Sequence, residues 1–247
     1  STTTSRPFHH PVPLGHLAGR RFHPVRRTPM HEWHEKAGAQ FMYVGSWLRP
    51  EYYAPKDESR DVCILDEARQ MRQNVGIIDV GTLGKIEVSG PDSVAFLERI
   101  YTGKFFRQPV GRIRYALACD ESGVIIEDGV IARLAEDRFY VTATTSGVLA
   151  FFRELQRWAL LWRLNVALVN GTGHWAAMNI AGPRSREVLS TLTDLDLSPE
   201  AFPYLGVREG SVLNGPARVM RVGFVGELGY EIHVPASRGL HVWSSLM

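Results

Sequence analysis

Alternating apolar and polar positions between residues 112 and 145 predict a three-stranded antiparallel meander. Two apolar runs flank a turn at residues 119–123, and a third run at residues 139–143 follows the short stretch 135–137. Runs rich in β-branched residues and separated by short turns with Gly are typical of hairpins. We therefore expect three consecutive strands that pair as neighbours.

The middle strand of this meander, residues 124–131, carries Glu127 and Asp128 where apolar residues are expected. Because neighbours in a strand point to opposite faces, the two carboxylates cannot form a close pair. If both faces of the sheet are covered, at least one carboxylate lies in apolar surroundings, where desolvation raises its pKa unless a cation or a donor compensates. The alternative is an edge strand with solvated acids, and the pattern leaves both open.

The chain contains an internal repeat. Residues 85–101 read as a strand, a Gly-Pro turn and a helix, and residues 177–193 repeat this unit. The two turns begin at Gly90 and Gly182, 92 residues apart, and Gly147 and Gly239 mark a second matching pair at the same separation. This repeat predicts two similar halves, about 84–165 and 174–247, in an α+β fold of antiparallel sheets with helices on one face.

Both ends of the chain suggest further sequence. Residues 1–28 are rich in Pro and Arg and predict an extended leader or linker ahead of a module at residues 29–247. The basic cluster Arg20, Arg21, Arg26 and Arg27 could meet a phosphate or an acidic partner, although a solvated linker is favoured. The last predicted helix stops at Met247, before it reaches the length of its counterpart, so we expect a truncated second half.

The segment between the leader and the repeat predicts several short elements. Thr28 and Pro29 suit a helix start, with Thr28 as the N-cap, and Gly38 suits its end. The sequence at residues 31–35 is not a HExxH motif, so it indicates a polar helix face rather than a metal site. A short strand at 41–44, a loop up to Pro55, a helix at 58–74 and a strand at 77–80 follow.

Composition narrows the classes of function. The 247 residues are 45% hydrophobic, which is enough for a large core, and the net charge of +2 favours neither nucleic acid nor membranes. Cys63 and Cys119 have no metal-binding spacing and fit a reduced, cytoplasmic protein. No apolar run approaches the ~18 residues that span a bilayer. Residues 171–176 match GxGxxA but lead into a strand, so we reject a dinucleotide site there.

A second misplaced acid lies near the end of the chain. Within residues 221–235, Glu227 falls in a turn between glycines, and Glu231 lies between Tyr230 and Ile232 in a predicted strand. A buried strand glutamate needs donors, which a ligand with adjacent N–H groups would supply. Exposure at a sheet edge is the alternative, and the pattern alone slightly favours it.

Several spaced motifs resemble the aminomethyltransferase family, which includes the glycine-cleavage T-protein and the folate-binding parts of sarcosine and dimethylglycine oxidoreductases. They are GELGYEI, the two strand–Gly-Pro–helix units, VGIIDVGTLGKIEVSGP and ESGVIIEDGV. The segments RRTPMHEWHEKAGAQFMYVGSW, DVGTLGKIEV and SPEAFPYLGVREG resemble the C-terminal part of the alpha subunit of heterotetrameric sarcosine oxidase. T-proteins carry Ser-His-Met where this chain has Gly81-Thr82-Leu83. The resemblance covers residues 14–247.

This resemblance implies tetrahydrofolate binding and one-carbon transfer. The family's essential aspartate maps onto Asp128, and the glutamate that binds the pterin ring maps onto Glu231. Tyr115, thirteen residues before Asp128, matches a tyrosine that lines the folate site in relatives. Glu127 replaces the first Asp of the usual pair. A further folate-contacting arginine and the family's C-terminal β-barrel would lie beyond Met247.

The resemblance also implies partners and cofactors. In the sarcosine oxidase branch, a flavin (FMN or FAD) oxidises sarcosine to an imine, which tetrahydrofolate captures as 5,10-methylenetetrahydrofolate with release of glycine. Flavin and NAD would then belong to the beta subunit, other subunits or domains outside this chain. The alternatives are a stand-alone aminomethyltransferase that takes carbon from a lipoyl carrier protein and a folate-binding module without catalysis.

Overall fold

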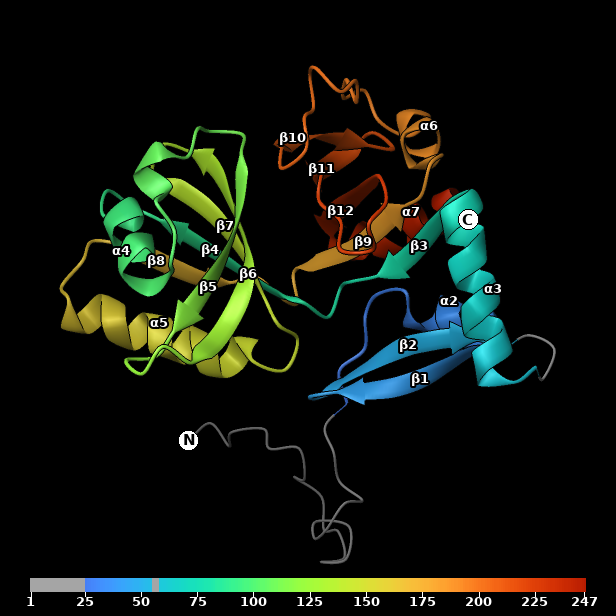
Figure 1. Cartoon of the computed structure of the whole chain (residues 1–247), viewed down its shortest axis with the longest axis horizontal. Coiled ribbons are helices and arrows are strands. Elements are labelled where there is room, and N and C mark those ends of the chain that lie inside the picture. The colour runs from blue at the N-terminus through green and yellow to red at the C-terminus, as the bar shows by residue number, and fades with distance from the viewer. Residues whose placement is uncertain (1–24, 55–57) are drawn as a thin grey trace, which may run out of the picture.

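The computed structural model describes residues 25–54 and 58–247, and it places two five-stranded antiparallel sheets beside each other (Figure 1). In spatial order, the first sheet contains β5 (Ile113–Cys119), β6 (Ile125–Ala135), β7 (Arg138–Ala143), β4 (Gly84–Ser89) and β8 (Ala167–Asn170). The second contains β10 (Val207–Val212), β11 (Gly215–Met220), β12 (Gly229–Pro235), β9 (Trp175–Ala181) and β3 (Gly76–Asp79). Residues 1–24 of the predicted leader lie outside the described residues.

Helices cover one face of each sheet, as the repeat predicts. The first sheet carries α4 (Ser93–Ile100), η2 (Phe105–Arg107) and α5 (Val148–Leu161), and the second carries α6 (Ser185–Ser190), η3 (Ala236–Arg238) and α7 (Gly239–Leu246). In α5 the apolar stripe of Val148, Phe151 and Leu155 is buried against the sheet. The α+β fold with two similar halves is therefore confirmed.

The two halves exchange a strand. β3 leads into the first half, yet it pairs with β9 of the second, and β8 leads into the second half, yet it pairs with β4 of the first. The crossing segments are fixed by backbone hydrogen bonds from Val80 N to Ala177 O (3.0 Å) and from Gly171 N to Lys85 O (2.8 Å). Each sheet is thus completed by the other half of the chain.

The faces without helices are turned toward each other. Side chains from both sheets form one shared apolar cluster, which consists of Ile113, Ala132, Tyr140, Val207, Met220 and Val222. The outer strands β5 and β10 are joined near their starts, where Ile113 N donates to Leu205 O (2.8 Å) and Val207 N donates to Gly111 O (2.9 Å). The inner faces of the two sheets are therefore held in fixed positions relative to each other.

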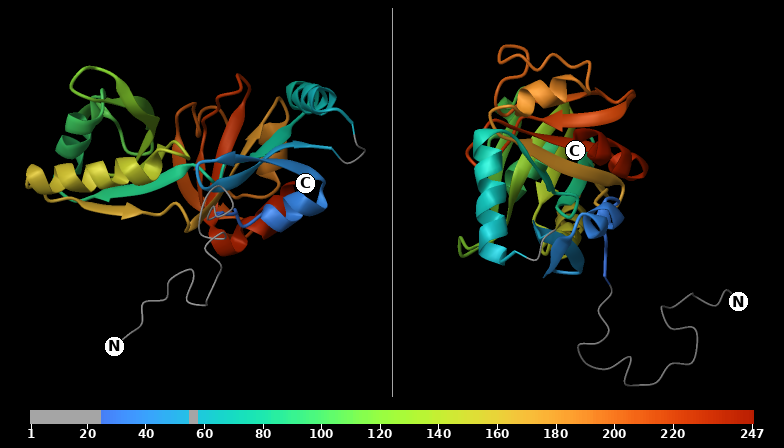
Figure 2. Two further views of the ribbon diagram at one scale, coloured as in Figure 1. Left: turned by 90° about the horizontal axis from the view of Figure 1, so that it is seen from below. Right: turned by 90° about the vertical axis from the view of Figure 1, so that its right-hand side faces the viewer.

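The segment before the repeat forms a hairpin and two helices beside the second sheet (Figure 2). These elements are α2 (His31–Lys36), β1 (Ala39–Val44), β2 (Trp47–Tyr53) and α3 (Arg60–Gln73). Trp33 of α2 packs edge-to-face on Trp243 of α7 with ring centroids 5.5 Å apart. The start of the described chain is thereby attached to the core of the second half.

Two predictions for this segment are wrong. Thr28 is not the N-cap of α2, which begins at His31, because the Thr28 hydroxyl donates instead to the buried carboxylate of Asp79 at 2.5 Å. The polar helix face is wrong for His31 and His34, which are both buried, whereas Glu32 and Glu35 are exposed. The helix ends at Lys36, shortly before Gly38 as predicted, and the φ of +80° at Gly38 suits a glycine.

The loop predicted up to Pro55 is wrong as well, because β2 occupies residues 47–53. It pairs with β1 along its length, and Pro50 lies opposite Phe41 beside a register shift. A proline is tolerated there because a two-stranded hairpin has only edge strands, where a missing N–H breaks no central ladder.

In the part of the chain that the structure describes, no helix is long and apolar enough to span a membrane. The same residues contain no group of three or more His, Cys, Asp or Glu side chains that could hold a metal ion.

Candidate functional site

Glu127 and Asp128 lie on β6, an internal strand between β5 and β7, so the edge-strand alternative is wrong. Glu127 is buried and accepts hydrogen bonds from the N–H (2.9 Å) and the hydroxyl (3.0 Å) of Thr144. Asp128 points to the opposite, inner face and is half-buried. The two acids thus have separate environments, and only Asp128 faces the second sheet.

Tyr115 and Asp128 form a hydrogen-bonded pair at this inner face. The Tyr115 hydroxyl donates to Asp128 Oδ2 at 2.6 Å, and this bond raises the pKa of Tyr115, so the phenol stays protonated at neutral pH. Tyr115 as a residue is 60% exposed. The pair therefore offers a carboxylate held by one donor beside an accessible aromatic ring.

Glu231 lies on β12, between β11 and β9, and is only 7% exposed, so its predicted exposure at a sheet edge is wrong. Its Oε2 lies 3.1 Å from His233 Nε2, and His233 Nδ1 lies 3.0 Å from the Tyr140 hydroxyl. Burial lowers the pKa of His233, although the bond to Glu231 partly opposes this shift. For a neutral imidazole, the network assigns the proton to Nε2, which donates to Glu231, while Nδ1 accepts from Tyr140.

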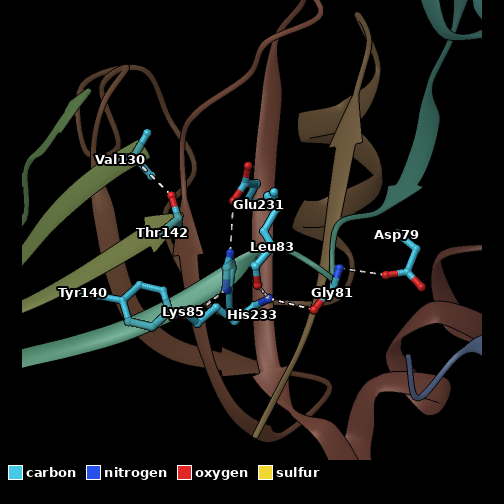
Figure 3. Close-up of polar contacts among 9 residues, drawn as sticks. All are labelled: Asp79, Gly81, Leu83, Lys85, Val130, Tyr140, Thr142, Glu231 and His233. Atoms are coloured by element: carbon cyan, nitrogen blue, oxygen red, sulfur yellow. Dashed lines mark hydrogen bonds and ion pairs between the residues drawn. The ribbon is translucent and has the colours of Figure 1, made fainter. Parts of the chain in front are cut away.

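Lys85 is fully buried beside these groups. Figure 3 shows its side chain near His233 and Glu231, where Nζ donates to the carbonyl oxygens of Gly81 (3.0 Å) and Leu83 (2.8 Å). Burial lowers the pKa of Lys85 to about 8, and the carboxylates of Glu231 and Asp79 partly offset the shift. We did not predict a role for Lys85, although a lysine at the start of an apolar strand was a visible signal.

The lowered pKa of Lys85 predicts a pH-dependent stability. The unfolded lysine keeps its proton up to its ordinary pKa of 10.5, whereas the folded one loses it from about pH 8. Since the unfolded state binds more protons in this window, stability rises with pH there. We expect wild type to gain about 3 kcal/mol relative to Lys85→Met between pH 8 and 10.5. Denaturant unfolding at each pH measures the difference.

The exposed Lys104 provides the control for this experiment, because Lys104→Met should differ from wild type by a constant amount over the same pH range. If the difference between wild type and Lys85→Met were also constant with pH, Lys85 would keep an ordinary pKa in the fold.

Asn179 is a further polar group on this face of the second sheet. It lies on β9 directly opposite Glu231 of β12 and is fully buried. Among the described residues, neither its Oδ1 nor its Nδ2 has a hydrogen-bond partner. The sequence carried a signal for it, because Asn179 interrupts the otherwise apolar interior of β9.

Asp79 belongs to a different buried network, on the helix-covered face of the second sheet. Its carboxylate accepts from Thr28 Oγ1 (2.5 Å), Gly81 N (2.8 Å) and His34 Nε2 (3.0 Å). The Tyr53 hydroxyl lies 2.8 Å from His34 Nδ1. These contacts connect the β1–β2 hairpin, α2 and β3, which indicates a structural role.

The three residues named from the sequence thus fall on the two inner faces. β5 and β6 present Tyr115 and Asp128 from the first sheet, and β12 presents Glu231 from the second. Both faces continue into the shared cluster through Tyr140 and Met220, and Met220 is the cross-strand neighbour of Glu231. Such an arrangement can accept hydrogen bonds from a ligand with N–H groups on one side and place a proton acceptor on the other.

Comparisons with known proteins agree with this architecture. The family model described as the GCVT N-terminal domain matches residues 30–247. The chain is 40% identical over 256 residues to the sarcosine oxidase subunit alpha of Rhizobium meliloti (strain 1021), an alignment that covers 100% of this chain and 26% of that protein. It is 28% identical over 223 residues to an aminomethyltransferase of Desulfitobacterium hafniense (strain DSM 10664 / DCB-2), which covers 90% of this chain and 58% of that protein.

Among solved structures, the glycine cleavage system aminomethyltransferase T from Bartonella henselae matches with a TM-score of 0.78 and 27% identity, over 90% of this chain and 56% of that one. The chain therefore spans about a quarter of the sarcosine oxidase subunit and somewhat more than half of the aminomethyltransferases.

Proposed function

Because this chain belongs to the aminomethyltransferase family of the GCVT N-terminal domain, we propose that it binds tetrahydrofolate between its two sheets and takes part in one-carbon transfer. The observation that carries the proposal is Glu231, a buried carboxylate whose Oε2 is held by His233, on the sheet face opposite Asp128. A buried carboxylate with few donors of its own is suited to a ligand that brings N–H groups.

The residues of the inner faces fit a reduced folate. The pterin ring has an edge of adjacent N–H and NH₂ groups, which suits a carboxylate such as Glu231. The exposed ring of Tyr115 offers an apolar surface to the ligand, and the unpartnered amide of Asn179 adds polar capacity beside Glu231. When bound, tetrahydrofolate supplies the nitrogen nucleophiles that accept the one-carbon unit.

Asp128 is the proposed catalytic group. Formation of the new carbon–nitrogen bond releases a proton from a folate nitrogen, and the carboxylate of Asp128 accepts that proton or stabilises the charge beside it. The hydroxyl of Tyr115 holds Oδ2 of Asp128 in place, which leaves Oδ1 for the proton. Glu231 contributes by orienting the ring and not by moving a proton.

The finer proposal concerns the source of the carbon. The 40% identity to a sarcosine oxidase subunit alpha along the whole chain supports a role in the same kind of complex. There, a flavin on a partner subunit would oxidise sarcosine to its imine. Transfer of the imine carbon to tetrahydrofolate in this chain would give 5,10-methylenetetrahydrofolate and glycine. We propose the beta subunit of sarcosine oxidase and further subunits as partners.

A second function is a stand-alone aminomethyltransferase that receives its carbon from a lipoyl carrier protein. The likeness to the Bartonella henselae enzyme supports it. T-proteins carry Ser-His-Met where this chain has Gly81-Thr82-Leu83, and this difference favours the role in a sarcosine oxidase complex. Activity with a lipoylated carrier protein and no need for a flavin subunit would decide for the second.

We expect Glu231→Gln to weaken the binding of tetrahydrofolate by about 10- to 100-fold, because a charged acceptor is replaced by a neutral amide. Isothermal calorimetry with the protein that carries this chain measures the affinity. Glu187→Gln, on the exposed surface of α6 where Glu187 pairs with Arg184, is the matched control and should bind as wild type does. Equal affinities of wild type and Glu231→Gln would remove Glu231 from the folate site.

A further inference from the structure

Asn179 lies on the inner face of the second sheet, on β9, next to the central strand β12. Its cross-strand neighbours are Glu231 on β12 and Ile78 on β3, so these three side chains share one face. Directly opposed residues in an antiparallel pair have Cβ atoms about 4.5–5.5 Å apart. The amide of Asn179 therefore lies beside the carboxylate that we propose as the pterin anchor.

Three other polar side chains of this region, those of Lys85, His233 and Thr142, have partners, whereas Nε of buried Arg218, the cross-strand neighbour of His233, has none among the described residues. Lys85 Nζ donates to two carbonyl oxygens, His233 joins Glu231 and Tyr140, and the hydroxyl of Thr142 accepts from Val130 N at 3.1 Å. By contrast, both polar atoms of the Asn179 side chain are without one among the described residues, and both are closed to water. Buried amides are almost always paired, so an unpaired one needs a specific explanation.

A bound ligand explains the unpaired amide. Both polar atoms of Asn179 are closed to solvent, so a ligand that pairs with them has to displace the side chains that cover them. The neighbouring Glu231 side chain keeps 9% of its surface exposed. The carboxylate offers acceptors only, whereas the amide adds a donor, Nδ2, and an acceptor, Oδ1. Together they match a ring edge that presents two donors followed by a carbonyl oxygen.

We propose that Asn179 is a specificity-determining residue for the folate ring, donating from Nδ2 to the ring carbonyl while Glu231 accepts from the neighbouring N–H and NH₂ groups. This inference rests on the proposed function. In the ligand-free protein the amide is an unpaired buried polar group, and the ligand supplies its missing partner. Asn179 therefore contributes to ligand binding but lowers the stability of the ligand-free protein.

The test separates these two effects in Asn179→Leu, which keeps the side-chain size but removes both polar atoms. We expect its melting temperature without ligand to equal or exceed that of wild type, because an unpaired buried amide is replaced by an apolar group. Its affinity for tetrahydrofolate should fall about tenfold or more, since the ring carbonyl loses its donor. Thermal unfolding and calorimetry of the protein that carries this chain give the two readouts.

Met178→Leu, on the same strand but facing the apolar core, is the matched control and should keep the wild-type affinity. If Asn179→Leu fails to fold, Asn179→Ala gives the same comparison. Wild-type affinity in these variants, or a lowered melting temperature together with a normal affinity, would overturn the inference and leave the proposed function standing. A wild-type protein that binds no tetrahydrofolate would overturn both.

Discussion

Asp128→Ala is expected to lower the formation of 5,10-methylenetetrahydrofolate by about 10²- to 10⁴-fold in the complete enzyme, while sarcosine is oxidised at the wild-type rate. The reason is spatial, because Asp128 alone of the two β6 acids faces the second sheet, and oxidation would take place at a flavin elsewhere. Carbon that is not transferred should appear as formaldehyde. Quantifying both one-carbon products against the amount of sarcosine consumed measures the diversion.

Glu127→Gln is the control for this experiment, since Glu127 is the adjacent acid on the same strand but is directed at Thr144. We expect it to cost stability and to preserve the ratio of methylenetetrahydrofolate to formaldehyde. An Asp128→Ala enzyme that still transfers its carbon at the wild-type yield would exclude Asp128 from the mechanism.

Asp79→Ala is expected to lower the free energy of unfolding by about 3–5 kcal/mol, the largest stability effect that we predict. The substitution removes one buried carboxylate and leaves the Thr28 hydroxyl, the Gly81 N–H and the His34 ring without their acceptor. Buried groups left unpaired lose far more than the net value of a single hydrogen bond. The midpoint of urea unfolding at an unchanged m-value measures the loss.

The internal repeat supplies a matched control for Asp79. Asn170 ends β8 as Asp79 ends β3, and its Oδ1 likewise accepts from an N–H two residues further on, that of Thr172 (3.1 Å). Asn170 Oδ1 also accepts from the Thr172 hydroxyl (2.6 Å), but among the described residues it has no partner from the N-terminal segment, so Asn170→Ala should cost only about 1 kcal/mol. Equal losses for the two variants would mean that the contacts of Asp79 with the N-terminal segment add nothing.

Local pattern was sufficient for much of the fold. The meander and the repeat follow from period-two alternation, Gly-containing turns and one constant spacing, and these features do not depend on distant contacts. The partner of β3 could not be predicted in this way. The sequence of a four-residue strand does not indicate which strand it pairs with, and β3 pairs with β9 in the sheet of the other half.

Local pattern also predicted only part of the candidate site. Alternation fixes that Glu127 and Asp128 face opposite ways, but it does not show whether a face is covered by protein or by water. Exposure was therefore favoured wrongly for Glu231. His233 and Asn179 were overlooked because their significance arises only through cross-strand neighbours, which the sequence does not display.

The N-terminal errors have one cause. Thr28 and the two histidines of α2 have local preferences for a cap and for an exposed face, yet buried tertiary partners outweigh them. Residues 47–53 contain a proline and aromatic side chains that resemble a loop, although pairing with β1 makes them a strand. Local preferences for a helix cap, an exposed face or a loop are weak predictors where tertiary contacts determine the structure.

The strand exchange between the halves has a consequence for how such a chain can arise and come apart. If one half of the chain were produced alone, its sheet would have an unpaired edge and the strand that pairs with the other half would have no partner. Two copies of such a half could pair with each other through these elements, as in domain swapping. Joining the two copies in one polypeptide makes that association permanent and independent of concentration. Neither half can then melt first, since the loss of either withdraws a strand from its neighbour.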